Sequence, residues 1–325
     1  MITLPKKPNR DFLVLNLSDP QLGNGEWDMG HPNRRIFTET TRALVEKVQP
    51  DLITITGDLS WAGNDAAYDA IADFLDSLQI PWAPVWGNHD NQNGAAYIDS
   101  VVERYLTHPY CRYEKGDPAL GNGNYVIGIM EDERVVEGLI LMDSHDQELY
   151  PTPENGGERY VWAKLWPEQL IWYREQVEML QKQGCGDSTL LMHIPIYAYN
   201  DAWNAAIRPD VDPEAVDPQH TADCWNPGYE GSFGVRYEGI CSYPEDEGAF
   251  AVIQSLGHTH HIVSGHDHVN NFVIPYEGVQ FIYSLKAGAG CYWDPRLNGG
   301  TVLRITENGV TEVWHEFVDP TTYRE

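Results

Sequence analysis

The sequence is poor in cysteine and has no long hydrophobic run. Its cysteines are Cys111, Cys185, Cys224, Cys241 and Cys291. They are odd in number and include no Cys-x-x-Cys pair, which argues against a disulfide framework or a cysteine zinc knuckle and favours a reducing compartment. Residues 1–7 lack the apolar core of a signal peptide, and no later stretch approaches a membrane span. We therefore expect a cytoplasmic protein without a membrane partner.

Basic residues are also scarce. The chain has 21 Lys and Arg against 49 Asp and Glu, a formal net charge of −28 at neutral pH. A surface this acidic repels phosphate backbones, so we expect no nucleic-acid partner. A length of 325 residues allows one large domain or two smaller ones. Because no linker, repeat or low-complexity tract interrupts the sequence, we expect a single domain over residues 1–325.

The first third alternates between strand and helix patterns. Apolar runs predict strands over 12–17, 51–56 and 81–86, and apolar residues at helical spacing predict helices over 34–48 and 65–78. This β-α-β-α-β order implies parallel strands joined by crossover helices. In such sheets, ligands collect beyond the carboxyl ends of the strands.

The rest of the chain mixes short strands with helices. The predicted helices cover 95–106, 167–183 and 248–256, and the predicted strands cover 125–130, 135–142, 189–192, 262–264, 272–275, 280–283, 301–306 and 311–317. Residues 195 to about 246 are rich in Pro, Tyr, Trp and Asp and show no regular period. A segment of this length is typical of a functional loop or lid.

Polar side chains of the metal-ligand type follow five of the predicted strands. These side chains are Asp19, Asp58, Asn88, His193, His266 and His268. Any one of them alone is more often a helix cap or a satisfied polar residue. A two-metal site needs hard or borderline ligands that converge from separate rigid elements, with a carboxylate shared by both ions. The set as a whole therefore predicts a binuclear metal centre.

The same residues form a series of motifs with a known order. Asp19-x-Gln21, Gly57-Asp58, Gly87-Asn88-His89-Asp90, His193 and Gly265-His266-x-His268 together resemble the calcineurin-like metallophosphoesterase superfamily. The resemblance extends from residue 19 to residue 268. It implies an α/β fold, a four-layer αββα sandwich in which two mixed β-sheets are flanked by helices. It also implies two divalent or transition metal ions, with Mn, Fe and Zn all open.

The resemblance assigns a role to each motif residue. It implies that Asp58 bridges the two ions, that Asp19, Gln21 and His268 complete the first position, and that Asn88, His193 and His266 complete the second. His89 would act as general acid or phosphate ligand, with Asp90 orienting its ring. The implied reaction is attack of a metal-bridging hydroxide on phosphorus, which two closely spaced ions make accessible near neutral pH.

The implied activity is hydrolysis of phosphate esters, and a phosphomonoesterase is the first expectation. A phosphodiesterase acting on cyclic nucleotides, or a non-catalytic scaffold of the same fold, are the alternatives. The substrate could be a small phosphate ester or a phosphoprotein, and the oligomeric state stays open. Residues 234–240 and 265–270 further resemble an intracellular subgroup related to the purple acid phosphatases.

Two positions depart from the family pattern. Gln21 stands where the family usually has His, so the first metal position is either weaker or lacks this ligand. Trp61 occupies the position of the Tyr that colours the iron of purple acid phosphatases, and an indole cannot ligate. We therefore do not expect a purple protein.

Outside the motifs, the residue assignments are less specific. Arg236 is the preferred phosphate-binding arginine because of its motif context. Tyr197 and its aromatic neighbours Tyr199 and Trp203 either line the substrate cleft or form a small aromatic core. A second Gly-His-x-His sequence at 257–260 follows a helical segment instead of a strand, so we interpret it as a surface turn.

Overall fold

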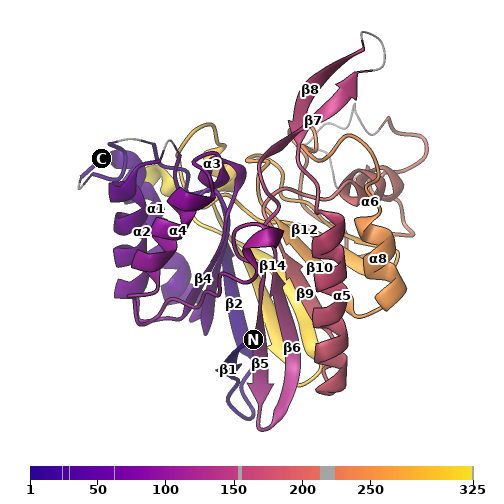
Figure 1. Cartoon of the computed structure of the whole chain (residues 1–325), viewed down its shortest axis with the longest axis horizontal. Helices are drawn as coiled ribbons and strands as arrows, with labels where there is room; N and C mark the ends of the chain where they lie inside the picture. Colours follow the sequence, from indigo (N-terminus) through magenta and orange to yellow (C-terminus); the bar gives the residue numbers. More distant parts are fainter. Residues whose placement is uncertain (24, 29, 62, 153–155, 213–223, 324–325) are drawn as a thin grey trace.

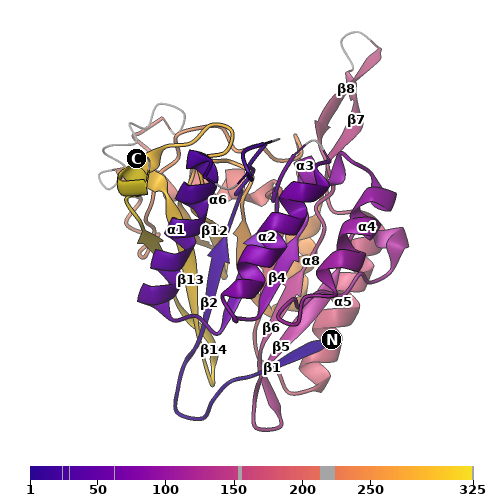
Figure 2. The ribbon, with the colours of Figure 1, turned by 90° about the vertical axis from the view of Figure 1, so that its left-hand side faces the viewer.

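Two β-sheets face each other, and helices cover their outer faces (Figure 1, Figure 2). The computed structural model describes residues 1–325 except 24, 29, 62, 153–155, 213–223 and 324–325. One sheet has five strands and the other seven, and each combines parallel with antiparallel pairs. The predicted four-layer α/β sandwich is thereby confirmed.

The five-stranded sheet carries the three parallel strands at the start of the motif series. Its order is β14 (Gly309–Phe317), β13 (Gly299–Thr306), β2 (Phe12–Leu17), β3 (Leu52–Thr56) and β4 (Trp82–Val85). β2, β3 and β4 are mutually parallel, whereas β13 runs antiparallel to β2. All five residues of β3 are buried, as expected for a parallel strand that is covered on both faces.

The seven-stranded sheet carries the histidine motifs. Its order is β1 (Ile2–Pro5), β5 (Tyr125–Glu131), β6 (Arg134–Leu141), β9 (Ser188–Leu191), β10 (Thr259–Ser264), β12 (Val279–Tyr283) and β11 (Val273–Tyr276). β6, β9, β10 and β12 are parallel neighbours, so their carboxyl ends lie on one edge of this sheet.

Helices complete the outer layers. α1 (Pro32–Val48), α2 (Asp65–Ser77) and α4 (Ala95–Tyr105) lie on the side of the five-stranded sheet, and α5 (Pro167–Lys182), α6 (Ala198–Ala206) and α8 (Ala249–Leu256) lie on the other side (Figure 1). α1 begins with Pro32 after the N-cap His31 and ends at the left-handed Gln49, in accord with the usual start and stop signals. None of the described helices has the length and apolar character needed to cross a bilayer.

Two hydrophobic clusters hold the layers together. One contains buried side chains from both sheets, such as Leu15, Leu139 and Val263, together with α1, α2 and α4. The other fills the space between the seven-stranded sheet and α5, α6 and α8, and it includes Tyr199 and Trp203. Of the three aromatic residues considered above, Tyr199 and Trp203 therefore belong to a core, whereas Tyr197 is only partly buried and is not part of this cluster.

The structure corrects three expectations about local structure. The segment 195–246 contains the regular helix α6, although residues 213–223 of it lie outside the described part. The sequence analysis missed the hairpin β7 (Gln147–Thr152) and β8 (Gly157–Trp162), whose largely exposed strands lack a strong hydrophobic alternation. The second Gly-His-x-His is no surface turn, because His258 is 3% exposed and contacts Ser188 Oγ and Cys185 O at 3.0 Å each.

Candidate metal centre

The motif residues follow the carboxyl ends of strands from both sheets. Asp19 and Asp58 come after the adjacent strands β2 and β3, and Asn88 begins the short helix α3 (Asn88–Asn91) just after β4. His193 and His266 come after β9 and β10, which are neighbours in the other sheet. Because the two sheets pack face to face, these five side chains meet at one end of the sandwich.

The predicted second metal position is compact. His193 Nε2 lies 3.0 Å from Asn88 Oδ1, 3.3 Å from Asp58 Oδ2 and 3.3 Å from His266 Nδ1. The potential ligand atoms of Asp19, Asp58 and His193 all lie within 4.8 Å of one another. The structure thus brings together the residues that the sequence proposed as ligands, while their coordination of metal stays a prediction.

Two of the histidines are held so that Nε2 faces this cluster. His193 Nδ1 lies 2.8 Å from the carbonyl oxygen of Thr56, and His268 Nδ1 lies 2.9 Å from that of Tyr292. His268 Nε2 is then 3.4 Å from Asp19 Oδ1. A carbonyl that accepts the Nδ1 proton fixes the tautomer and leaves Nε2 free to bind a metal, as is usual for histidine ligands.

Gln21 has hydrogen-bonding partners on both ends of its amide. Its Nε2 donates to Asp58 Oδ2 at 3.1 Å, and its Oε1 lies 3.4 Å from the ammonium of Lys286. Lys286 also donates to the carbonyl oxygen of Asp19 at 2.7 Å. Sequence reasoning missed this buried lysine because lysine is not a metal ligand, although its position shortly after β12 matches the pattern of the other residues.

His89 lies at the cavity, but Asp90 does not orient its ring. The His89 Nδ1 contacts Gln92 Oε1 at 3.0 Å, and its ring meets Trp61 edge-on with centroids 5.0 Å apart. Asp90 is fully buried and accepts hydrogen bonds from the Tyr68 hydroxyl at 2.7 Å and from Gly87 N at 2.8 Å. The expected partnership of Asp90 with His89 is therefore wrong, and Gln92 takes that place.

A cavity of about 120 Å³ opens onto the cluster. It is lined by Gln21, Asp58, Asn88, His89, Trp162, Cys241, His266, Asp267, His268, Cys291 and Tyr292. Trp162 comes from the hairpin β7–β8 and packs edge-on against His266 with centroids 4.4 Å apart. Neither Trp162 nor Cys241 belongs to a motif, so the sequence alone offered no signal for them.

The two predicted substrate contacts are not among the residues that line this cavity. The guanidinium of Arg236 lies 5.5 Å from the centroid of the Trp203 ring, and its Nε donates to Glu238 O at 3.2 Å. Tyr197 is the N-cap residue of α6, where its backbone N–H faces Glu247. The predictions that Arg236 binds phosphate and that Tyr197 lines the substrate cleft are thus without support from the cavity's geometry.

Burial and mutual charge set the protonation of the cluster. Burial raises the pKa of Asp19 and of Asp58, but charges and hydrogen bonds from His193 and other neighbouring basic groups together hold both pKa values below the usual range. Burial lowers the pKa of His193, yet Asp58 and Asp19 together raise it to about 10. Burial and His193 lower the pKa of His266 to about 3. The two carboxylates therefore attract positive charge, and His193 supplies it when no cation is bound.

Four residues of the predicted metal centre have strained backbone conformations. Asp19, Gln21, Asp58 and His266 have φ values of 52°, 43°, 51° and 78°, in the left-handed region that non-glycine residues rarely occupy. Such a conformation costs on the order of 1–3 kcal/mol per residue and recurs at functional sites. Gly87 allows close packing here, because a Cβ atom at this position would collide with the Asp58 carboxylate.

Several buried atoms of the cluster lack a hydrogen-bond partner among the described residues. They include Asp19 Oδ1 and His266 Nε2, which are atoms of the metal-ligand type, and Asn88 Nδ2, an amide N–H donor that is not. Leaving a buried polar atom unpaired costs about 1–3 kcal/mol, so such atoms need an explanation. Carboxylate, amide and imidazole donors together suit Mn, Fe or Zn ions. The residues present therefore fit a pair of metal ions.

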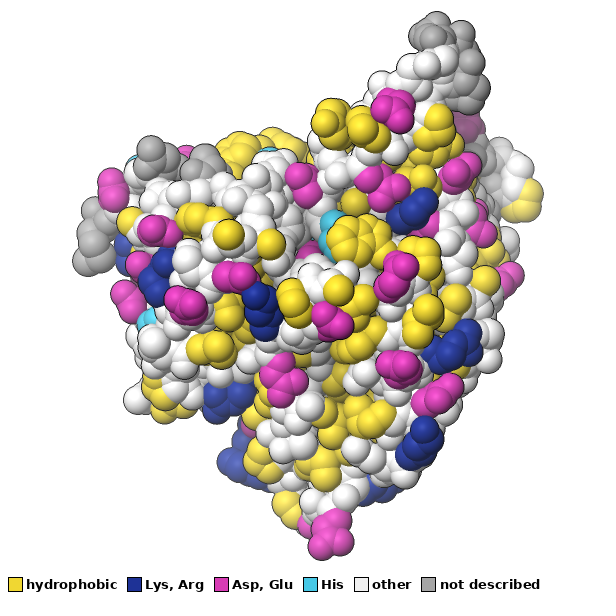
Figure 3. Space-filling view, in the orientation of Figure 1, with side chains coloured by type: hydrophobic (Ala, Val, Ile, Leu, Met, Phe, Trp, Pro, Cys, Tyr) yellow, Lys and Arg dark blue, Asp and Glu magenta, His cyan; other side chains and the backbone are white. Residues whose placement is uncertain are grey.

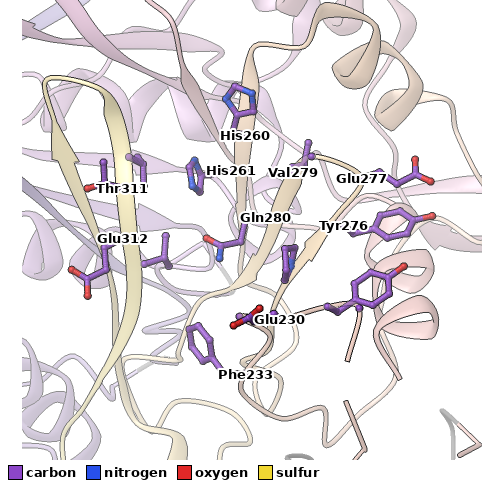
Figure 4. A pocket seen from close by; sticks show the side chains of 17 residues that line it. Glu230, Phe233, His260, His261, Tyr276, Glu277, Val279, Gln280, Thr311 and Glu312 are labelled. Carbon is purple, nitrogen blue, oxygen red and sulfur yellow. The ribbon is translucent and has the colours of Figure 1, made fainter. Parts of the chain in front are cut away.

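A larger hollow of about 850 Å³ lies elsewhere, between β14 and the strands β10, β12 and β11 (Figure 4). Its lining includes His260, His261, Gln280 and Glu312, and it contains none of the motif residues. By volume alone, this hollow would be the candidate functional site. The chemistry of the side chains selects the smaller cavity instead.

Comparisons with known proteins identify the family of the chain. A family model described as calcineurin-like phosphoesterase matches residues 12–270. The "Probable inactive purple acid phosphatase 28" of Arabidopsis thaliana is 26% identical over 335 residues, which cover 90% of this chain and 77% of that protein. Phosphatase DCR2 of Saccharomyces cerevisiae is 25% identical over 317 residues, which cover 90% of this chain but only half, 50%, of the yeast protein.

Solved structures show the same fold. A dimetal phosphatase from Danio rerio has a TM-score of 0.52 at 14% identity, with 94% of this chain and 98% of that chain covered. A purple acid phosphatase from yellow lupin seeds has a TM-score of 0.53 at 9% identity, with 94% and 53% covered. The family match, together with relatives of the purple acid phosphatase type, confirms both resemblances found in the sequence. The chain belongs to the calcineurin-like phosphoesterase family.

Proposed function

We propose that this protein is a metal-dependent phosphoesterase that hydrolyses phosphate monoesters. The observation that carries the proposal is the meeting of Asp19, Asp58, Asn88, His193 and His266 at one end of the sandwich. Three of them, Asp58, Asn88 and His266, line the small cavity, and Asp19 Oδ1 and His266 Nε2 are buried without a hydrogen-bond partner among the described residues. Two bound divalent ions would offset the charge of a phosphoryl group and acidify a water molecule. The reaction also needs a proton donor for the leaving oxygen, and a residue of the chain can supply it.

His89 is the proposed proton donor to the leaving oxygen. It lines the cavity, and its Nδ1 is held by Gln92, which leaves Nε2 as the nitrogen available to a substrate. Its backbone N–H donates to Asp58 Oδ1 at 2.9 Å, so the proposed acid and the proposed bridging carboxylate keep a fixed separation. A histidine imidazole in this position can donate a proton to a departing alkoxide as a general acid.

The test is hydrolysis of p-nitrophenyl phosphate by the purified full chain after metal removal and reloading with Mn²⁺, Fe²⁺ or Zn²⁺. We expect turnover only with metal, and we expect Asp58→Asn to reduce it by at least about a hundredfold because the shared carboxylate is lost. Asp132→Asn, in the turn between β5 and β6, is the matched control and should keep full activity. A metal-loaded protein without turnover, or an active Asp58→Asn variant, would refute the proposal.

A phosphodiesterase acting on cyclic nucleotides is the second candidate. A "Probable cyclic nucleotide phosphodiesterase" of Moraxella catarrhalis is 36% identical over 83 residues, 25% of this chain. Rates on bis-p-nitrophenyl phosphate and cyclic AMP, measured beside the monoester, distinguish the two activities. Faster hydrolysis of either diester would replace the monoesterase proposal.

A further inference from the structure

A second group of potential ligands lines the same cavity. The ligand atoms of Cys241, His266 and Asp267 all lie within 4.8 Å of one another. Asp267 is 3% exposed, and His266 is 8% exposed. Of these three residues, only His266 belongs to the predicted binuclear centre, so Cys241 and Asp267 form a chemically distinct extension of it.

Two of the three side chains carry an unpaired buried atom. Asp267 Oδ1 and His266 Nε2 have no hydrogen-bond partner among the described residues. The other carboxylate oxygen, Asp267 Oδ2, accepts hydrogen bonds from Cys241 N at 3.0 Å and from the Tyr283 hydroxyl. The carboxylate is therefore fixed through Oδ2, and the Cys241 thiol, in hydrogen-bonding contact with this carboxylate, and the His266 imidazole lie beside it.

This donor set is softer than that of the binuclear centre. Sulfur, imidazole nitrogen and one carboxylate oxygen form a three-ligand set of the kind that binds Zn²⁺ and other thiophilic ions. Mn²⁺ and Mg²⁺ prefer sites made only of oxygen and nitrogen, so they would remain at the binuclear centre. His266 is common to both groups: its Nδ1 lies 3.3 Å from His193 Nε2, and its Nε2 has no hydrogen-bond partner among the described residues.

The geometry points to a separate site for one thiophilic metal ion, built from Cys241, His266 and Asp267 beside the binuclear centre. The inference rests on the proposed function only through His266, which both sites share.

The test uses Cd²⁺ as the probe, because cadmium–thiolate bonds absorb in the ultraviolet and oxygen or nitrogen ligands do not produce this band. Cys291→Ser serves as the background, since it removes the exposed thiol that lines the same cavity. We expect one saturable cadmium–thiolate band per chain in this background. Adding Cys241→Ser should abolish the band, and adding Asp267→Asn should weaken Cd²⁺ binding by about tenfold or more. Adding Cys224→Ser, a buried cysteine outside the cavity, should leave it unchanged.

A second measurement needs no substitution and guards against a variant that fails to fold. Zn²⁺ should protect Cys241 of the natural chain from alkylation by iodoacetamide, as read by peptide mass spectrometry, while Cys291 continues to react. A band that survives Cys241→Ser, or alkylation of Cys241 that Zn²⁺ does not slow, would overturn the inference. Neither readout depends on turnover. A protein with the band but without hydrolysis refutes only the proposed function, and hydrolysis without the band refutes only this site.

Discussion

His89 and Asp90 are adjacent in the sequence but have opposite environments. His89 faces the cavity, with its ring between Trp61 and Gln92, whereas Asp90 points into the protein and binds Tyr68. Burial and the neighbouring Asp58 raise the pKa of Asp90 to about 7. His89 is therefore positioned to contact a ligand in the cavity. Asp90 instead stabilises the turn that holds His89 there.

Replacing His89 tests the first of these roles. Under the proposed function, His89→Gln should lower kcat for p-nitrophenyl phosphate by about 10²–10⁴-fold, because general-acid catalysis contributes roughly this much. Metal content measured by elemental analysis should stay unchanged, since His89 is not a predicted ligand. Gln92→Ala should cause a smaller loss, because the ring keeps its place but loses the partner of Nδ1. Undiminished kcat in His89→Gln would exclude it as the proton donor.

Removing the Tyr68 hydroxyl tests the role of Asp90. Tyr68→Phe leaves a buried carboxylate with one donor fewer, which should lower the free energy of unfolding by about 1–3 kcal/mol in urea titration. Tyr160→Phe is the control, because Tyr160 is 69% exposed and its hydroxyl contributes little. Equal stability of the two variants would contradict a structural role for this contact.

At the scale of single residues, the sequence predicted which side chains meet but not how each is held. The positions of Asp19 and Asp58 after apolar runs placed them at one edge of a parallel sheet. His193 follows a strand of the other sheet, and its place beside them was implied by the family resemblance. The hydrogen bond of Asp90 depends on a side chain 22 residues away, and that of Lys286 on a backbone carbonyl 267 residues away. No local pattern encodes partners at that distance.

The helices and strands were likewise predicted only in part from the sequence. The buried strands and amphipathic helices were found because their hydrophobic period is strong, as in α2 with buried Ile71, Phe74 and Leu75. The hairpin β7–β8 is mostly exposed, so its strands gain little from burial and leave no such period. It nevertheless supplies Trp162 to the cavity. Residues that complete a site from an exposed element are the ones that pattern analysis misses.

Glu137 links strands of the two sheets and should make their packing depend on pH. This fully buried residue of β6 accepts from Thr189 Oγ1 of β9 at 2.9 Å and from Val310 N of β14 at 3.3 Å. Burial, and then Asp187, raise its pKa well above the ordinary value of 4.5. The folded state therefore retains a proton that the unfolded chain releases, and this contribution to stability is lost as the pH rises through the folded-state pKa.

Glu137→Gln removes that titration while keeping a side chain of the same shape. In urea unfolding across a pH series, the stability of the variant relative to the natural chain should be constant below pH 4.5 and should increase as the pH rises above it. Glu133→Gln, in the exposed turn of the same hairpin, should show no such trend. A difference that stays constant across the whole range would mean that Glu137 ionises normally.

The whole molecule is dominated by negative charge. Acidic side chains are spread over the face seen in the space-filling view, among fewer basic ones (Figure 3), and the formal net charge is −28. Self-repulsion at this charge opposes the compact state. Raising the salt concentration from about 10 mM to about 150 mM shortens the Debye length from about 30 Å to about 8 Å. The thermal unfolding midpoint of the metal-free protein should therefore rise with NaCl, and a midpoint that falls would show that attractive ion pairs dominate instead.

The pairing of β13 with β2 places the end of the chain beside its first motif. The family match stops at residue 270, yet β13 forms the antiparallel neighbour of β2, and Lys286 holds the Asp19 carbonyl. A recombinant fragment cut at residue 270 would expose β2 as an unprotected edge and would lose β11 and β12 from the other sheet. We expect such a fragment to aggregate on expression, whereas one cut after β14 should remain monodisperse in gel filtration. The protein therefore needs strands beyond the residues that match the family model in order to fold.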